Sequence, residues 1–351
     1  MQYDALIVGQ GLAGTLISWE LEKSGWTVCH VDPGHERAAS NVAAGLMNPI
    51  TGRRYVKSWR FDDLLPIARA TYLELEKALG INLYNEYGII RSLFNHREEN
   101  DWLARTGDPA YQPYMLDEPR LASYADYIRP AYSYGEVRQS AQVYIGRLIK
   151  AYRKRLSAKN AILEEAFDYQ RLHVSEHSVR YGQATARCVV FAEGAAAAKN
   201  PYFAHLPFGG AKGQAIWVRI PGADFPKILK QRIFIVPWEK DIYWIGSTNS
   251  NHFEHDGPTE EARAYLTERL SDILTLPFEL LEHRSAVKPT VKDRRPFLGR
   301  HHEHPNLYIF NGLGTKGTSL GPYWAVHLRD FILKNSTLDR EVDIRRFSRR
   351  D

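Results

Sequence analysis

The sequence predicts an α/β protein with a Rossmann-type domain and a second α+β domain built on a mainly antiparallel sheet. Two observations predict the Rossmann-type domain. A glycine-rich turn joins an apolar strand to a helix within residues 5–25, and a second such turn follows the apolar run 307–310. Alternating β-forming residues through 213–250 predict the antiparallel sheet. The 351 residues of the chain are enough for two domains.

The composition excludes several other classes of protein. Hydrophobic residues make up 44% and charged residues 25%, which excludes a disordered or fibrous chain. The net charge of +5 is too small to indicate nucleic-acid binding by itself. We expect no membrane span, because no stretch approaches about 18 apolar residues, and we expect no secretory signal. With only two cysteines, Cys29 and Cys188, no disulfide framework is expected, and we predict a cytoplasmic protein.

The first glycine-rich turn has the spacing of a dinucleotide-binding motif. The apolar run 5–8 is typical of a buried strand, and Gly9, Gly11 and Gly14 follow it as G-x-G-x-x-G. Gly9 allows the tight turn, Gly11 lets the backbone approach a pyrophosphate, and Gly14 lets the helix pack closely on the sheet. The motif therefore predicts a site for the ADP half of NAD or FAD.

The next helix and strand complete a βαβ unit. The helix begins at Leu12 and Ala13, so its free N–H groups and positive dipole end point toward the pyrophosphate. Residues 27–31 predict the second strand, which ends at Asp32. An acidic residue there accepts a hydrogen bond from the ribose and disfavours the 2′-phosphate of NADP.

Hydrophobic spacing predicts the remaining elements. Apolar residues recur at three- and four-residue steps in 63–79 and 143–156, as in amphipathic helices. Further helices are predicted at about 258–275 and 320–334. The run 188–192 is predicted as a buried strand that stops at a glycine.

Three later segments favour FAD over NAD, because each offers a further contact for a long, extended cofactor. They are a small-residue loop at 40–47, a buried strand that stops at a glycine at 189–195, and the second strand-to-glycine-to-helix turn at 311–317. The candidate FAD-binding residues in and around these segments are Ala43, Ala44, Gly45, Leu46, Phe167, Ala192, Gly194, Gly312, Gly314, Thr315, Lys316, Gly317 and Thr318.

With these motifs, the sequence resembles the FAD-dependent D-amino-acid oxidase (DAO) family, with a pattern similar to that of glycine oxidase. The resemblance covers nearly the whole chain and is weakest between about 60 and 135. The matching segments are 9–14, 43–47, 189–194, 212–214, 235–237, 245–248, 288–299 and 312–322. The resemblance implies a noncovalent FAD that takes a hydride from the C–N bond of a small amine or amino acid, and that is reoxidised by oxygen or another acceptor.

The resemblance also implies the substrate pocket. Lys288, before Pro289, stands where the family has its carboxylate-binding arginine; lysine keeps the charge but loses the two-point grip. Phe234 stands in place of a pocket tyrosine, and Asn249 in place of a methionine of glycine oxidase. Lys316 and the helix N-terminus after it would favour the negative charge that the flavin gains on reduction.

The predicted FAD-binding domain comprises residues 1–60, 140–200 and 285–351, and the predicted substrate domain 61–139 and 201–284. The sequence predicts no particular oligomeric state. An alternative function is an FAD-dependent tRNA-modifying oxidoreductase that acts on a glycine-like group of a modified nucleoside, and a contiguous basic surface beside the cleft would favour it. A third possibility is a non-catalytic FAD-binding module.

One further cluster of polar residues resembles a metal site. His301, His302, Glu303 and His304 follow one another, but they lie in a polar loop without helical spacing. We therefore predict no metal site.

Overall fold

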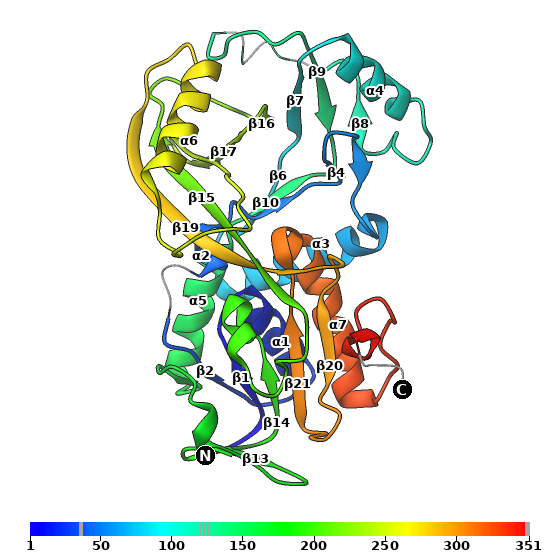
Figure 1. Cartoon of the computed structure of the whole chain (residues 1–351), viewed down its shortest axis with the longest axis vertical. Helices are drawn as coiled ribbons and strands as arrows, with labels where there is room; N and C mark the ends of the chain where they lie inside the picture. Colours follow the sequence, from blue (N-terminus) through cyan, green and yellow to red (C-terminus); the bar gives the residue numbers. More distant parts are fainter. Residues whose placement is uncertain (35–37, 120, 122–123, 125, 348–351) are drawn as a thin grey trace.

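The computed structural model describes residues 1–34, 38–119, 121, 124 and 126–347. Two large sheets organise the molecule, one in each half of Figure 1. The lower half holds the parallel strands, and the upper half holds the antiparallel sheet. The predicted fold class, a Rossmann-type domain with a second α+β domain, is confirmed.

The lower sheet contains the predicted βαβ unit. Its parallel strands stand in the order β11 (Ile162–Leu163), β2 (Val28–Val31), β1 (Gln2–Val8), β14 (Ala184–Phe191) and β21 (Leu307–Asn311). Strands β12 (Leu172–Val174), β13 (Val179–Tyr181) and β20 (Phe297–Arg300) extend this sheet in antiparallel pairing. Because β1, β14 and β21 are parallel neighbours, the turns that follow them meet at one edge.

Four helices bury their apolar faces on one side of the lower sheet. They are α1 (Leu12–Lys23), α3 (Phe61–Leu79), α5 (Ile145–Ala158) and α7 (Gly317–Lys334). Helix α3 lies in the predicted substrate domain by sequence, yet Ala68, Tyr72 and Leu75 on its apolar face join this cluster. The reason is that the apolar stripe of α3 packs on α7 (Figure 1). The two-domain division by residue number therefore stays a proposal.

The upper sheet stands in the order β19 (Glu279–Val291), β15 (Phe208–Arg219), β18 (Ile242–Gly246), β17 (Phe234–Glu239), β16 (Ile228–Lys230), β7 (Ile89–Leu93), β9 (Ser133–Val137) and β8 (Met115–Leu116). Helix α6 (Glu260–Ile273) covers one face, where Leu266 and Leu270 pack on Ile216 and Ile245. The opposite face packs on Val42 of the lower half. We call this second face the inner face.

Shorter elements join the two halves. Helices α2 (Ala39–Val42) and α4 (His96–Thr106), the three-stranded sheet β3 (Leu46–Met47), β10 (Ala141–Val143) and β6 (Tyr84–Glu86), and the hairpin β4 (Ile50–Thr51) and β5 (Val56–Lys57) make up this part. The 3₁₀ turns are η1 (Tyr169–Arg171), η2 (Gly194–Lys199), η3 (Gly314–Lys316) and η4 (Ile344–Phe347). Strand β19 and helix α4 were not predicted from the sequence.

The fully buried His30 of β2 predicts a loss of stability in acid. Its Nε2 lies 2.9 Å from the Ser18 hydroxyl, and burial lowers its pKa to about 4. Below pH ~6.5 the unfolded chain takes up this proton and the folded chain does not, so stability falls from pH ~6.5 to ~4, by up to ~3 kcal/mol. Denaturant unfolding between pH 7 and 4.5 should therefore show a shallower loss for His30→Gln than for the wild type. The exposed His177→Gln serves as the control and should keep the wild-type slope.

Candidate active site

The predicted glycine-rich segments meet at the carboxyl edge of the lower sheet. Gly9 follows β1, Ala192 follows β14, and Asn311 ends β21, and these three strands are parallel neighbours. The Ala192 N–H donates to the Val8 carbonyl at 2.8 Å, and the Asn311 side-chain amide donates to the Gly194 carbonyl at 3.0 Å. Turns from both ends of the sequence are thus hydrogen-bonded side by side, as a long cofactor across this edge requires.

Two glycines of the first turn are required by close backbone contacts. A Cβ on Gly14 would lie 2.0 Å from the Gly9 carbonyl oxygen, and a Cβ on Gly9 would lie 2.5 Å from the Ala192 carbonyl oxygen. Gly9 also has a φ of +97°, which side-chain-bearing residues rarely adopt. The tight turn and close helix packing assigned to these glycines from the sequence are both present.

The N-termini of α1 and α7 lie against each other. A Cβ on Gly317 would lie 3.4 Å from Leu12 Cδ2, and a Cβ on Gly321 would lie 2.5 Å from Leu16 Cδ1. Gly321 was missed by the sequence analysis, although its four-residue step from Gly317 places both glycines on one helix face. Neither helix has a side-chain hydrogen bond from its N-cap residue, and at α1 the Ser40 hydroxyl accepts the Leu12 N–H, so the positive ends of both dipoles can still act on an anion.

Asp32 lies at the end of β2, beside the first turn. Its Oδ2 accepts the Gln10 N–H at 2.8 Å, and its Oδ1 accepts Gly34 N–H at 2.7 Å and Arg153 Nη1 at 2.8 Å. Among the described residues Oδ2 accepts this one hydrogen bond, and because a carboxylate has about four acceptor positions, a second one on Oδ2 is left for a ribose hydroxyl. Arg153, on the polar face of α5, was missed; its position on a predicted amphipathic helix carried no signal for this contact.

The small-residue loop at 40–47 is used partly for packing. A Cβ on Gly45 would lie 1.8 Å from the Val143 carbonyl oxygen, so this glycine is needed for the approach to β10. Leu46 pairs with Gln142 in the same small sheet. Ser40, the first residue of the predicted 40–47 loop, accepts the Leu12 N–H at 3.1 Å and so reaches the N-terminus of α1, a contact that the sequence did not predict.

Phe167 packs within a cluster of aromatic side chains. Its ring stacks on Tyr181 with 4.6 Å between centroids and meets the edge of Phe191 at 5.8 Å. The neighbouring Tyr169 hydroxyl is hydrogen-bonded to Glu193, within the 192–194 turn. Phe167 is thus next to a predicted cofactor segment, and its contact with FAD stays a prediction.

The second turn directs Lys316 toward the β4–β5 hairpin. The Lys316 ammonium donates to Ser58 Oγ at 3.1 Å and to Thr51 Oγ1 at 3.4 Å. Burial lowers the pKa of Lys316, and the neighbouring Arg294 and Arg295 lower it further. Of the other residues predicted here, Thr318 is buried and Thr315 is exposed.

The predicted substrate residues lie on the inner face of the upper sheet. The Lys288 ammonium donates to Asn249 Oδ1 at 3.1 Å and lies over Gly213, where a Cβ would come within 2.9 Å of it. Burial lowers the pKa of Lys288. The carbonyl of the next residue, Pro289, is 3.9 Å from the Cβ position of Gly314, which joins this strand to the second turn. Phe234 lies three strands from Lys288 on the same face.

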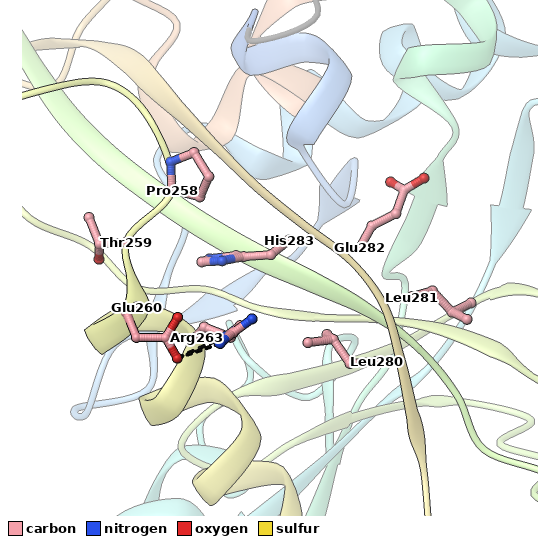
Figure 2. Close-up of a pocket in the computed structure, with 8 residues that line it drawn as sticks. All are labelled: Pro258, Thr259, Glu260, Arg263, Leu280, Leu281, Glu282 and His283. Carbon is pink, nitrogen blue, oxygen red and sulfur yellow. Dashed lines mark hydrogen bonds and ion pairs between the residues drawn. The ribbon is translucent and has the colours of Figure 1, made fainter.

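A separate cavity of about 390 Å³ opens on the α6 side of the upper sheet (Figure 2). The lining residue His283 is an odd number of positions from Lys288 on β19, so the two side chains point to opposite faces. Arg263 pairs with Glu260 at 2.6 Å, as the dashed line in Figure 2 shows. Arg263 and Glu260 thus neutralise each other, and the cavity lies on the face of the sheet opposite to Lys288.

The histidine cluster is closer together than the sequence indicated. Ligand atoms of His301, Glu303 and His304 lie within 4.8 Å of one another. However, His301 Nδ1 accepts the backbone N–H groups of Glu303 and His304 at 3.1 and 3.2 Å. His301 also stacks on His302 and His304, so ring packing accounts for the cluster and we assign no metal to it.

Comparison with known proteins agrees with this arrangement. The model of the DAO family, described as FAD dependent oxidoreductase, matches residues 4–330. The chain belongs to this family. Membership confirms the resemblance inferred from the motifs and makes FAD the cofactor of this flavoprotein.

Several members of the family are similar over nearly the whole chain. Glycine oxidase from Geobacillus kaustophilus is 27% identical over 366 residues, covering 96% of this chain and 94% of that protein. The crystal structure of glycine oxidase from that organism has a TM-score of 0.82 at 22% identity and covers 97% of each chain. The bifunctional protein ThiO/ThiG from Nostoc sp. is 24% identical over 361 residues, covering 96% of this chain but only 54% of that protein. The chain thus spans about half the length of this relative.

The residues at the sheet edge fit FAD. The N-termini of α1 and α7, whose N-cap residues make no side-chain hydrogen bond, suit its pyrophosphate and the charge of its ring, and among the described residues Asp32 Oδ2 has a single partner, which leaves an acceptor position for its ribose. Cys29 and Cys188 are both buried, and burial raises their pKa to about 11 and about 12. Neither thiol is a reactive nucleophile, which supports a noncovalent cofactor. Over the described residues, no helix combines the length and apolar character that crossing a membrane requires.

The backbone approach at Gly11 predicts a variant that folds but loses FAD. Gly11 has φ −78°, and a Cβ there would meet only the Ser40 hydroxyl at 3.3 Å. We expect Gly11→Ala to unfold within ~2 °C of the wild-type apoprotein but to bind FAD at least ~10-fold more weakly, because the methyl group displaces the pyrophosphate. Melting temperature and FAD titration measure the two effects. Gly107→Ala, where the nearest atom is 3.7 Å away, is the control and should retain FAD.

Proposed function

We propose that the chain is an FAD-dependent oxidase or dehydrogenase that oxidises the C–N bond of a small amine or amino acid. One observation carries this proposal. Lys288 is half-buried on the inner face, next to the second turn, and among the described residues no carboxylate lies within ion-pair distance of it. A desolvated cation without an anionic partner favours a carboxylate from the substrate.

The chain's own residues bind and orient the substrate. The Lys288 ammonium has three N–H donors and uses one for Asn249 Oδ1, which leaves two for a substrate carboxylate. Burial lowers the pKa of Lys288, and a carboxylate beside it would act in the opposite direction, because it stabilises the charged form. Asn249 fixes the direction of the ammonium group, and it partly replaces the geometric constraint that an arginine would supply.

The second turn supplies positive potential beside this face. Lys316 and the N-terminus of α7 contribute it together, and burial strengthens their effect on a nearby negative charge. Bound FAD supplies the redox chemistry, in which it takes a hydride from the carbon that carries the amine and passes the electrons to oxygen or another acceptor. We nominate no protein base, because a neutral amine already carries the electron pair that the reaction needs.

The direct test is anaerobic reduction of the purified holoprotein. Amines and amino acids are added one at a time, and the visible flavin absorption is recorded. We expect bleaching with at least one small amine or amino acid. A flavin that stays oxidised with every compound would support the non-catalytic FAD-binding module instead.

The role of Lys288 predicts a difference between substrate types. Lys288→Met should raise KM for a carboxylate-bearing substrate by about 10- to 100-fold, because a charge-assisted hydrogen bond is lost. KM for an uncharged amine should change by less than about threefold. Lys292→Met, at an exposed position just after β19, is the matched control. An equal loss for both substrate types would show that Lys288 does not bind the carboxylate.

A tRNA-modifying oxidoreductase acting on a glycine-like group is the second function to test. Arg53 and Arg54 are exposed at the tip of the β4–β5 hairpin, where they are accessible to phosphates. We favour the small substrate because Lys288 and Lys316 are half-buried, whereas backbone phosphates need exposed cations. Binding of tRNA that weakens steeply between about 50 and 200 mM salt would favour the RNA substrate, and no binding at either salt would exclude it.

A further inference from the structure

Two further cations share the inner face with Lys288. Side chains two residues apart on a strand point to one face, and Ala286, Ile228 and Ile89 all belong to the apolar cluster of the inner face. Lys288, Lys230 and Arg91 are each two residues beyond one of these, on β19, β16 and β7. The inner face therefore carries a cation near its β19 edge and a pair of cations on the adjacent strands β16 and β7.

The Lys230–Arg91 pair has neutral partners. The Lys230 ammonium lies 4.3 Å from the centre of the Phe234 ring and donates to the Arg232 carbonyl at 2.9 Å. The Arg91 guanidinium lies over Tyr55 at 5.0 Å and donates to the Gly52 carbonyl at 3.3 Å. No carboxylate of the described chain lies within 4 Å of either cation.

The electrostatics of this pair favour an anion from outside the chain. Burial, and then the field of Arg91, lowers the pKa of Lys230 to about 8. Burial also lowers the pKa of Arg91, and the Glu98 carboxylate offsets this only in part. Two adjacent, half-buried cations repel each other, and that cost is relieved when an anion binds between them.

The β4–β5 hairpin connects this pair to the second turn. Thr51 accepts a hydrogen bond from Lys316, and the next residue, Gly52, accepts one from Arg91. Arg91 is therefore fixed to the same piece of backbone as the lysine of the second turn. The Lys230–Arg91 pair thus lies on the side of the sheet where the substrate is expected.

The spacing between the two cationic positions suits a small molecule. Lys288 leans over Gly213 of β15, and Lys230 leans over Phe234 of β17. Only β18 separates those two strands, and there the Trp244 ring lies over Gly246, which pairs with Phe234, so that this indole forms the floor between the two cationic positions. Two strand spacings, with an offset along the strands, give roughly 12 Å between the ammonium groups. After an N–H···O contact of about 2.8 Å at each end, roughly 6 Å remains between the bound oxygens.

We propose that the substrate carries two anionic groups, one bound by Lys288 and the other by Lys230 with Arg91. The substrate class is an amino acid with a second carboxylate or a phosphonate. This proposal rests on the proposed function for the amine, but the second anion subsite depends only on the residues named here.

Binding of non-reactive acids to the oxidised holoprotein tests the subsite. Calorimetric titration compares glutarate with valerate and succinate with butyrate, so that each pair differs by one carboxylate. We expect the dicarboxylate to bind about 10-fold or more tightly in at least one pair, because it adds charge-assisted hydrogen bonds. 4-Phosphonobutyrate, tested beside glutarate, shows whether a phosphonate or a carboxylate fits better at the second position. Equal affinity within every pair would overturn the proposal.

Substitutions of Lys230 and Arg91 test whether this pair causes the preference for dicarboxylates. Lys230→Met and Arg91→Met should each remove most of the dicarboxylate advantage, while monocarboxylate affinity stays within about twofold. Lys230→Arg keeps the positive charge and should keep the higher affinity for dicarboxylates. It serves as a folded variant for comparison if Lys230→Met is unstable. Lys240→Met, at the exposed turn between β17 and β18, removes one charge elsewhere and is the control. An advantage that survives both Met substitutions would overturn the assignment to this pair.

These outcomes are separable from those of the proposed function. Dicarboxylate preference in a protein whose flavin no amine reduces would contradict the proposed function and leave the subsite intact. Reduction of the flavin by amines without any dicarboxylate preference would contradict the second anion subsite and leave the proposed function intact.

Discussion

Helices α1 and α7 touch at their first turns, and the cofactor site depends on this contact. Gly317 and Gly321 of α7 leave room for Leu12 and Leu16 of α1, so the axes approach closely and both N-termini stay at one sheet edge. The parallel pairing of β1, β14 and β21 fixes the strands that lead into both helices. A side chain at Gly321 would push the helices apart and separate the two positive ends that a dinucleotide needs together.

The cations of the candidate site differ from a cation nearby in whether a carboxylate neutralises them. Arg60, near the hairpin, is neutralised by Asp63 and Asp339, at 3.0 and 2.6 Å. Lys288 and Lys230, by contrast, have only neutral partners among the described residues. Keeping such cations partly desolvated costs stability, and a binding site is the usual reason for that cost. The unpaired charge of the inner face is the feature on which the proposed substrate site rests.

Local rules predicted the Rossmann-type half well. The G-x-G-x-x-G spacing, the helix stripes and the buried strands depend on neighbours in sequence, and the elements formed where expected. Strand β19 was missed because polar residues such as Glu282 and Arg284, together with Pro289, hide its β character; an edge strand tolerates all three. The contacts of Ser40 with α1 and of Arg153 with Asp32 were missed for another reason, since they join segments distant in sequence. The same applies to the Lys230–Arg91 pair, whose two residues become adjacent only when β16 and β7 pair.

The chain order of α1 and α7 has a consequence for biosynthesis. The first turn lies far before β21 and α7 in the chain and is therefore made before them. Until β21 has been made, the carboxyl half of β14 lacks its partner on that side, and such an unpaired edge is open to wrong pairing. A nascent chain that stalls before β21 would therefore lack one wall of the site predicted for the cofactor.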